Sequence, residues 1–146
     1  MPDGKVFLIS CYFGKSKPAD ANKFLQQFAE EISNLFNEGV IYNETTFSIS
    51  IQSVICDAPA KSFITLTKGR TGYFSYPKCT IEGNFIANRI CFPNFDYQAR
   101  TDDSFSNQLQ EEYHLGRSIL LNISHFGIVS HIPFNYMHII LALLKS

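Results

Sequence analysis

The sequence predicts an α/β domain, on the evidence of three successive segments. Residues 5–13 are a dense run of apolar, β-branched and aromatic side chains, which is typical of a strand buried on both faces. Residues 18–38 place apolar side chains three and four positions apart, the spacing of one buried helix face. Residues 46–56 begin with alternating apolar and polar side chains, which favours a strand with one polar face. The order strand, helix, strand predicts a βαβ-like unit.

Local signals mark the ends of the helices. Pro18 and Asp20 suit the first turn of the long helix, and Gly39 suits the position just after its last turn. A second helix is predicted over residues 58–67, where Pro59 is compatible only with the first turn. Both helices therefore have a sequence signal where they begin.

The rest of the chain is less regular. After the second helix the periodicity is lost, and Gly, Pro and aromatic residues become frequent. Within a single domain we predict a partial α/β core over residues 1–67, an irregular insert over 68–132 and the start of an apolar helix over 133–146. A short helix is predicted over 104–113. An irregular segment of this length needs a metal ion or a partner to order it.

Length and composition narrow the classes of protein. The 146 residues are the size of one ordinary domain, and the 45% hydrophobic content excludes a disordered tail. The 14 Phe residues, with no Trp, indicate a large aromatic core. The net charge of −1 excludes an overall positive field, so any contact with DNA must be local.

One stretch is long enough to cross a membrane. Residues 118–144 contain no Asp, Glu, Lys or Arg. Polar residues interrupt the stretch, so we interpret it as a buried, loop-broken core segment and expect no membrane contact. The four cysteines form no CxxC pair, and the N-terminus shows no signal-peptide pattern. We therefore expect free thiols and a nuclear or cytoplasmic protein that is not secreted.

Asp57 is the first candidate for chemistry. It directly follows the predicted strand 46–56, and α/β proteins place ligands and catalytic groups at this end of a strand. The alternative is that Asp57 caps the predicted helix 58–67, with its side-chain oxygen accepting hydrogen bonds from main-chain N–H groups. Position alone leaves both readings open.

Cys79, His114 and His138 are candidate zinc ligands, with His125 and His131 as further histidines. Zinc is bound tetrahedrally by thiolate and imidazole, and such a site would order an irregular segment. No two of these residues have the close spacing of a zinc motif. The alternative is that they are ordinary core or surface residues.

Basic and aromatic residues alternate from the second helix onward, a composition that suits binding of a nucleic-acid strand. The alternative is a solvated face over an aromatic core. The basic residues are Lys61, Lys68, Arg70, Lys78, Arg89 and Arg100, and the aromatic ones are Tyr73, Phe74, Tyr76 and Phe85. The chain contains no P-loop, dinucleotide-binding, serine-hydrolase or HExxH motif.

Five strings in order along nearly the whole chain resemble the central region of animal CACTA-like (En/Spm-related) DNA transposases. The strings around CDAPA and around YMH are the specific ones. They are ICDAPAKSF at 55–63, KGRTGYF at 68–74, RTDDSF at 100–105, QEEYHLG at 110–116 and PFNYMH at 133–138.

The resemblance implies an RNase H-like fold and a two-metal DNA strand-transfer chemistry. Residues 5–13, 18–38 and 46–56 correspond to the third strand, first helix and fourth strand of that fold. Asp57 corresponds to the second of three catalytic carboxylates and is by that correspondence a Mg²⁺ ligand. Two Mg²⁺ ions about 4 Å apart activate the attacking oxygen and stabilise the leaving one.

The sequence departs from the family pattern at several positions. The first catalytic carboxylate is expected before Val6, where Asp3 adjoins the wrong strand and is not assigned, and the third is expected after Ser146. Tyr76 stands where the family has the first cysteine of a CxxC pair, and Asn135 stands where it has an aspartate. Two of three catalytic groups are therefore missing.

The same comparison leaves a partial zinc set. Tyr113 replaces one of two paired histidines, so that Cys79, His114 and His138 remain as possible Zn²⁺ ligands. We therefore expect a fragment or decayed copy of a CACTA-like transposase that does not cleave DNA by itself. DNA is the partner implied by the family, and no small-molecule substrate is implied. The alternatives are a domesticated, non-catalytic DNA- or protein-binding module and a small unrelated zinc protein.

Overall fold

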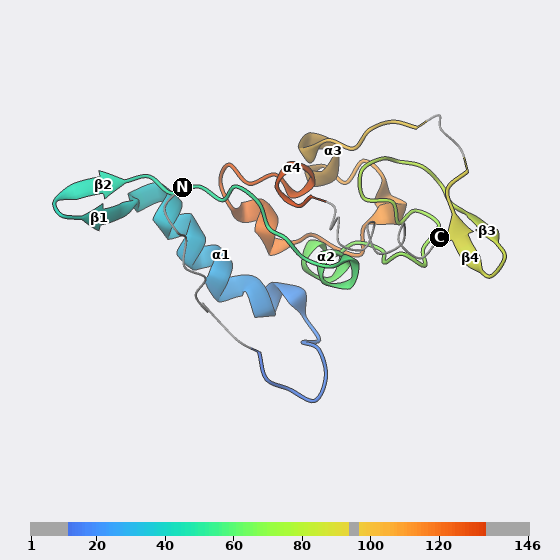
Figure 1. Cartoon of the computed structure of the whole chain (residues 1–146), viewed down its shortest axis with the longest axis horizontal. Helices are drawn as coiled ribbons and strands as arrows, with labels where there is room; N and C mark the ends of the chain where they lie inside the picture. The colour runs from blue at the N-terminus through green and yellow to red at the C-terminus, as the bar shows by residue number, and fades with distance from the viewer. Residues whose placement is uncertain (1–11, 94–96, 134–146) are drawn as a thin grey trace, which may run out of the picture.

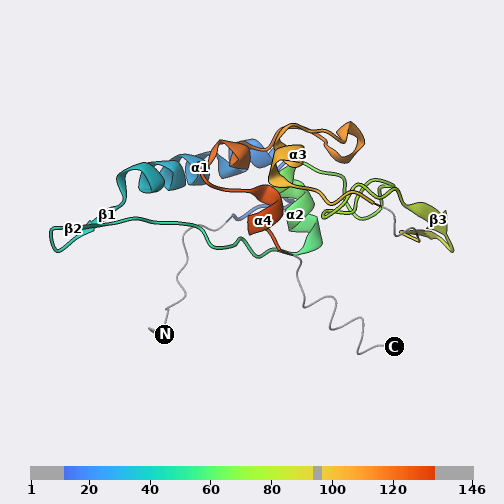
Figure 2. The same ribbon diagram turned by 90° about the horizontal axis from the view of Figure 1, so that it is seen from above.

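The computed structural model describes residues 12–93 and 97–133 of the chain. In this part the protein has mixed α/β structure, with four α-helices and two small two-stranded antiparallel sheets. The two sheets lie at opposite ends of the molecule, and the helices pack between them (Figures 1 and 2). The predicted α/β class is confirmed at this level.

The longest helix, α1, spans Ala21–Glu38. Asp20 caps its start by accepting hydrogen bonds from the main-chain N–H groups of Asn22 (2.9 Å) and Lys23 (3.2 Å). Gly39 ends it with φ +72° and donates its N–H to the Leu35 carbonyl. The predicted helix is confirmed, and it begins later than residue 18 because the cap is Asp20.

The segment after α1 is a hairpin and not one long strand. β1 (Val40–Tyr42) pairs antiparallel with β2 (Thr45–Phe47), and the turn residues Asn43 and Glu44 both have positive φ. Residues 48–57 belong to no strand. The prediction of a strand over 46–56 is therefore wrong beyond Phe47. The tight turn pairs this segment with β1, and the pairing ends at Phe47 because β1 begins at its partner, Val40.

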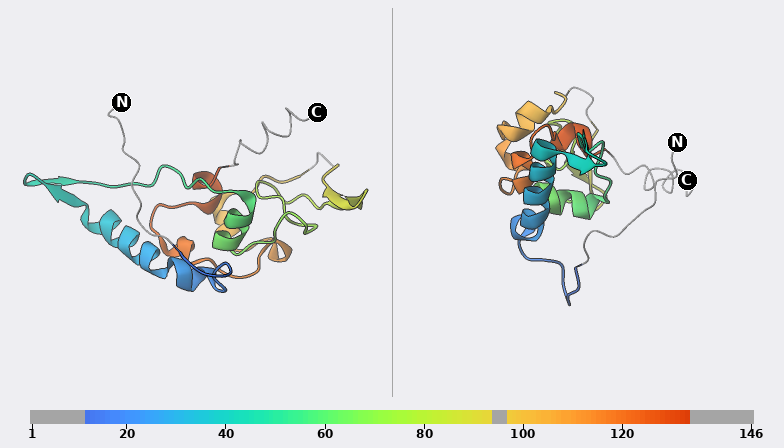
Figure 3. Two further views of the ribbon diagram at one scale, coloured as in Figure 1. Left: turned by 60° about the horizontal axis from the view of Figure 1, so that its bottom comes forward. Right: turned by 90° about the vertical axis from the view of Figure 1, so that its left-hand side faces the viewer.

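This outcome removes the βαβ unit from the described part of the chain, where no parallel strand pair occurs. Of the first predicted strand, residues 5–11 lie outside the described residues, and Tyr12 and Phe13 are exposed and in no strand. The hairpin β1–β2 projects from the end of α1 (Figure 3).

A second helix, α2, spans Ala58–Thr65 and confirms the predicted helix at 58–67. Pro59 lies in its first turn, where main-chain N–H groups have no acceptor within the helix, so that the N–H that proline lacks is not needed. Leu66 ends the helix with φ +52°, a left-handed conformation.

The segment predicted as an irregular insert consists of short elements. They are β3 (Asn84–Ile86), β4 (Arg89–Cys91), α3 (Asp102–Ser106), the 3-10 helices η1 (Glu111–Tyr113) and η2 (Ile119–Asn122), and α4 (Ile128–His131). The predicted helix at 104–113 is wrong in its bounds. Thr101 and Ser104 form a capping box that starts α3 two residues earlier, and α3 ends at Ser106.

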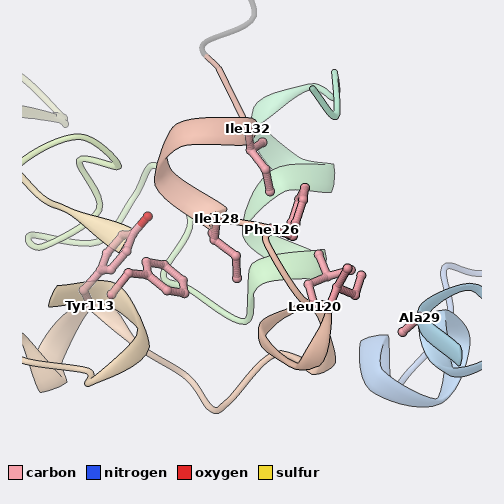
Figure 4. Close-up of a cluster of buried hydrophobic side chains, with 8 residues drawn as sticks. Ala29, Tyr113, Leu120, Phe126, Ile128 and Ile132 are labelled. Carbon is pink, nitrogen blue, oxygen red and sulfur yellow. The ribbon is translucent and has the colours of Figure 1, made fainter. Parts of the chain in front are cut away.

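The hydrophobic core lies mainly in this second half of the chain. Of the eight buried residues in the cluster, only Ala29 comes from α1 (Figure 4). The others are Phe105, Tyr113, Leu120, Ile123, Phe126, Ile128 and Ile132. The interpretation of residues 118–144 as a loop-broken core segment is thus confirmed for its described part, residues 118–133.

Helix α1 covers one side of this core. The Asn22 side chain accepts a hydrogen bond from the Ile119 N–H at 2.9 Å and donates one to the Arg117 carbonyl at 3.0 Å. These two bonds fix the start of α1 to η2. In the described residues, no helix combines the length and hydropathy needed to cross a membrane. The helix predicted after Pro133 lies outside the described residues.

Candidate functional site

Asp57 is exposed and caps α2. Its Oδ1 accepts a hydrogen bond from the Ala60 N–H at 2.7 Å, and its main-chain carbonyl accepts from the Lys61 N–H at 2.8 Å. In the described residues, no three His, Cys, Asp or Glu side chains are grouped so that they could hold a metal ion. The structure therefore gives Asp57 a capping role, and within the described residues Asp57 belongs to no group of three side chains that could hold a metal ion.

Cys79 is buried, with 2% of its surface exposed, and its thiol is free. Its carbonyl accepts a hydrogen bond from Arg100 Nη2 at 3.0 Å. Arg100 is also buried, and its guanidinium lies 3.9 Å from the centre of the Tyr113 ring. Burial lowers the pKa of Arg100 from its usual value, and the nearby Tyr113 partly opposes that shift.

His114 packs its ring against Phe105 and Tyr113, with ring centres 4.7 Å and 5.2 Å away. Both ring nitrogens are buried, and neither has a hydrogen-bond partner among the described residues. Burial lowers the pKa of His114, and the charge of Arg100 lowers it further. The neutral form is thus favoured.

The fit of Cys79 and His114 to a zinc ion is poor in the described structure. Both are neighbours of the Arg100 guanidinium, whose positive charge opposes a second cation. His138 lies outside the described residues. His125 is exposed, and His131 Nδ1 accepts a hydrogen bond from the Gly127 N–H at 3.0 Å. The described residues therefore assemble no zinc set.

The basic residues singled out in the sequence lie in four places. Lys61, Lys68 and Arg70 line one cavity beside α2. Arg100 is buried in the core, and Arg89 is exposed on β4. Lys78 donates to the main-chain carbonyls of Val129, in α4, and of Ile132, just after it. Three of the six basic residues noted in the sequence therefore lie together, at the cavity beside α2.

The cavity has a volume of about 270 Å³ and lies between α2 and the segment that follows it. Two aromatic rings, Tyr76 and Phe92, form part of its wall, with their centres 5.4 Å apart. Cys56, at the end of the segment that leads into α2, also lines it. Among the described residues that line the cavity, none is Asp or Glu. The site therefore combines an apolar wall with positive charge.

Lys61 is the most perturbed group of this cavity. Its Nζ donates a hydrogen bond to the Ile132 carbonyl at 2.9 Å. Burial, followed by repulsion from Lys78, lowers the pKa of Lys61 from 10.5 to about 8, while Cys56 opposes the shift. At neutral pH most Lys61 side chains still carry a proton, so that the cavity keeps their positive charge.

Sequence reasoning identified part of this cavity. The alternation of basic and aromatic residues pointed to Lys61, Lys68, Arg70 and Tyr76. It missed Phe92, which is a partner of Tyr76 only through tertiary structure. The link between Lys61 and Ile132 had no local signal either.

Comparisons of the chain with protein-family models, with curated proteins and with solved structures found no match. The class of this protein is therefore given by its mixed α/β fold and its basic, aromatic cavity, and function is argued from that site.

Proposed function

We propose that this chain derives from a DNA transposase resembling the CACTA-like family and that, by itself, it binds DNA without cleaving it. The motif strings support the family assignment, above all ICDAPAKSF at 55–63. The proposal assigns α1 to the first helix of an RNase H-like fold.

The observation that carries the binding activity is the cavity beside α2. Lys61, Lys68 and Arg70 line it together, although the net charge of the chain is −1. Phosphate groups of a DNA strand are attracted to such a local concentration of cations. Binding is therefore expected at this site and not over the whole surface.

The second half of the proposal, absence of cleavage, rests on the surroundings of Asp57. A two-metal centre needs several carboxylates that converge on the ions. Asp57 supplies one carboxylate, and its Oδ1 already accepts a hydrogen bond from Ala60. In the transposase assignment Asp57 is a Mg²⁺ ligand only when other carboxylates join it.

A non-catalytic binding module that has kept this fold is the second candidate. The same cavity favours it, since a cavity lined by cations and aromatic rings binds an anionic partner without any catalytic residue. The two candidates differ in origin and agree in the expected activity, which is binding.

Two measurements on the full 146-residue chain test the proposal. Fluorescence anisotropy of a labelled DNA duplex at increasing salt concentrations should show binding that weakens with salt, with a log–log slope of roughly −3 for three phosphate contacts. Incubation of supercoiled plasmid with Mg²⁺ or Mn²⁺ should leave it intact. Nicking that is lost in Asp57→Asn would contradict the absence of cleavage, and absence of duplex binding at low salt would contradict the binding function.

A further inference from the structure

We infer that the cavity beside α2 is a nucleotide-binding site, in which an aromatic base lies against Tyr76 and Phe92 and a phosphate is bound by Lys68 and Arg70. If the nucleotide belongs to a DNA strand, this inference rests on the proposed function. The binding of a nucleotide by the side chains of this cavity does not depend on it.

The size of the cavity selects the ligand. A volume of about 270 Å³ is close to the lower limit of small-molecule sites in proteins. It accommodates one nucleotide-sized molecule, whereas the bases of a duplex are stacked and paired and cannot enter it, so that a duplex reaches this site only through its backbone phosphates. The nucleotide must therefore be free or unpaired.

The charges select an anion. Lys61, Lys68 and Arg70 approach the cavity from α2 and from the segment just after it. A guanidinium binds phosphate oxygens with two parallel hydrogen bonds, and an ammonium adds a point charge. Because no carboxylate is among the described lining residues, no negatively charged side chain there repels an anionic group in the cavity.

The aromatic pair selects a flat, apolar group beside the anion. The Tyr76 and Phe92 rings are tilted by 60° to one another, and both residues line the cavity. Nucleobases stack on such rings whatever their identity, so that binding without base specificity is expected. The combination of one phosphate and one aromatic group is the chemistry of a nucleotide.

Two sources supply this chemistry, a free mononucleotide and an unpaired nucleotide in a DNA strand. Affinities are measured by isothermal titration for thymidine 5′-monophosphate, inorganic phosphate and a ten-nucleotide oligothymidylate. The variants are Arg70→Gln and Phe92→Leu, and Arg89→Gln is the matched control, because Arg89 is an exposed arginine on β4 outside the cavity lining. Circular dichroism confirms that each variant is folded.

The expected result is binding of the monophosphate and the oligonucleotide, weakened about tenfold in Arg70→Gln and several-fold in Phe92→Leu. Arg89→Gln should stay within twofold of the wild type. Tighter binding of the oligonucleotide than of the monophosphate identifies a DNA strand as the source, and equal or weaker binding of the oligonucleotide identifies a free nucleotide. Both outcomes support the nucleotide site.

Three outcomes contradict the inference. Binding that neither variant weakens would place the ligand elsewhere, while leaving the proposed DNA binding intact. Inorganic phosphate binding as tightly as the monophosphate would remove the role of the aromatic rings. Absence of binding to all three ligands would overturn the site, and duplex binding measured separately would then decide whether the proposed function survives.

Discussion

The Lys61 ammonium donates a hydrogen bond to the main-chain carbonyl of Ile132 at 2.9 Å, across 71 positions of the chain. Lys78 donates to the same carbonyl at 3.4 Å. The last carbonyls of a helix have no partner within it, so these two side chains satisfy groups at the end of α4. Because Lys61 also lines the cavity, the wall of the candidate site is held by the same contact that joins α2 to α4.

Replacing Lys61 should change how stability depends on pH. The pKa of Lys61 is about 8 in the folded state and has its usual value of 10.5 in the unfolded chain. As the pH rises, Lys61 therefore loses its proton in the folded state first. The contribution of Lys61 to stability is therefore fully present above about pH 10.5 and is lost as the pH falls through about 8. The free energy of unfolding of the wild type should rise relative to Lys61→Met between these two values.

The measurement is urea unfolding from pH 7.5 to 10.5. It is made in a Cys56→Ser background, because the Cys56 thiol, whose pKa is raised by burial, titrates nearby. Lys23→Met on the exposed side of α1 is the control and should run parallel to the wild type. A constant difference between the wild type and Lys61→Met over this range would contradict the prediction.

His114 should make the fold sensitive to acid. Its lowered folded pKa means that the unfolded chain takes up a proton first as the pH falls below about 6.5, so that stability is lost from that point downward. His114→Phe, which keeps an aromatic ring against Phe105 and Tyr113, should lack this loss. Thermal unfolding at pH 7.5 and pH 5 measures the difference.

The control for this experiment is His125→Asn, since His125 is exposed and has φ +59°, which asparagine adopts readily. It should keep the acid sensitivity of the wild type. If His114→Phe loses as much stability on acidification as the wild type does, another group is responsible.

Asp57 should behave as a helix cap. Asp57→Ala removes the hydrogen bond to the Ala60 N–H and should reduce the free energy of unfolding by about 0.5–2 kcal/mol. Asp57→Asn should cost little, because asparagine is an equally good cap. Chemical denaturation of both variants gives the comparison, and equal destabilisation by the two would mean that the carboxylate charge has a role beyond capping.

Asp102 should anchor α4 to α3. Its Oδ1 accepts hydrogen bonds from the N–H groups of Val129 (2.6 Å) and Ser130 (3.1 Å). Asp102→Ala should therefore lower the free energy of unfolding by about 1.5–3 kcal/mol. Asp103→Ala is the matched control, because Asp103 also lies in the first turn of α3 and is exposed. Similar losses in both would assign the effect to the charge at the helix start.

Sequence patterns predicted the helices better than the strands. The apolar spacing and the Asp20 and Gly39 caps of α1 act over a few residues, and the same holds for Pro59 in α2. The alternation after residue 46 was a weaker guide. Whether such a segment forms a long strand depends on the length of the strand that pairs with it. The Asn43–Glu44 turn places it beside β1, which is short.

The location of the core could not be predicted for the same reason. Residues 105–132 lack a clear period, yet they supply Phe105, Tyr113 and Ile132 to the buried cluster. Short helices such as α3 and α4 have no long amphipathic stripe to detect. Their burial depends on contacts with distant segments.

By itself, the sequence determined helices α1 and α2, the Asp20 and Gly39 signals at the ends of α1, and the absence of an overall positive charge, because these depend on neighbouring residues or on composition. Only the tertiary structure decided that Lys61, Arg70 and Phe92 line one cavity and that Arg100 is buried in the core. It also decided that Asp57 caps a helix and, in the described residues, belongs to no group of three possible metal ligands. Those facts depend on distances between residues far apart in the chain, which are set by packing and by bonds such as that from Lys61 to Ile132.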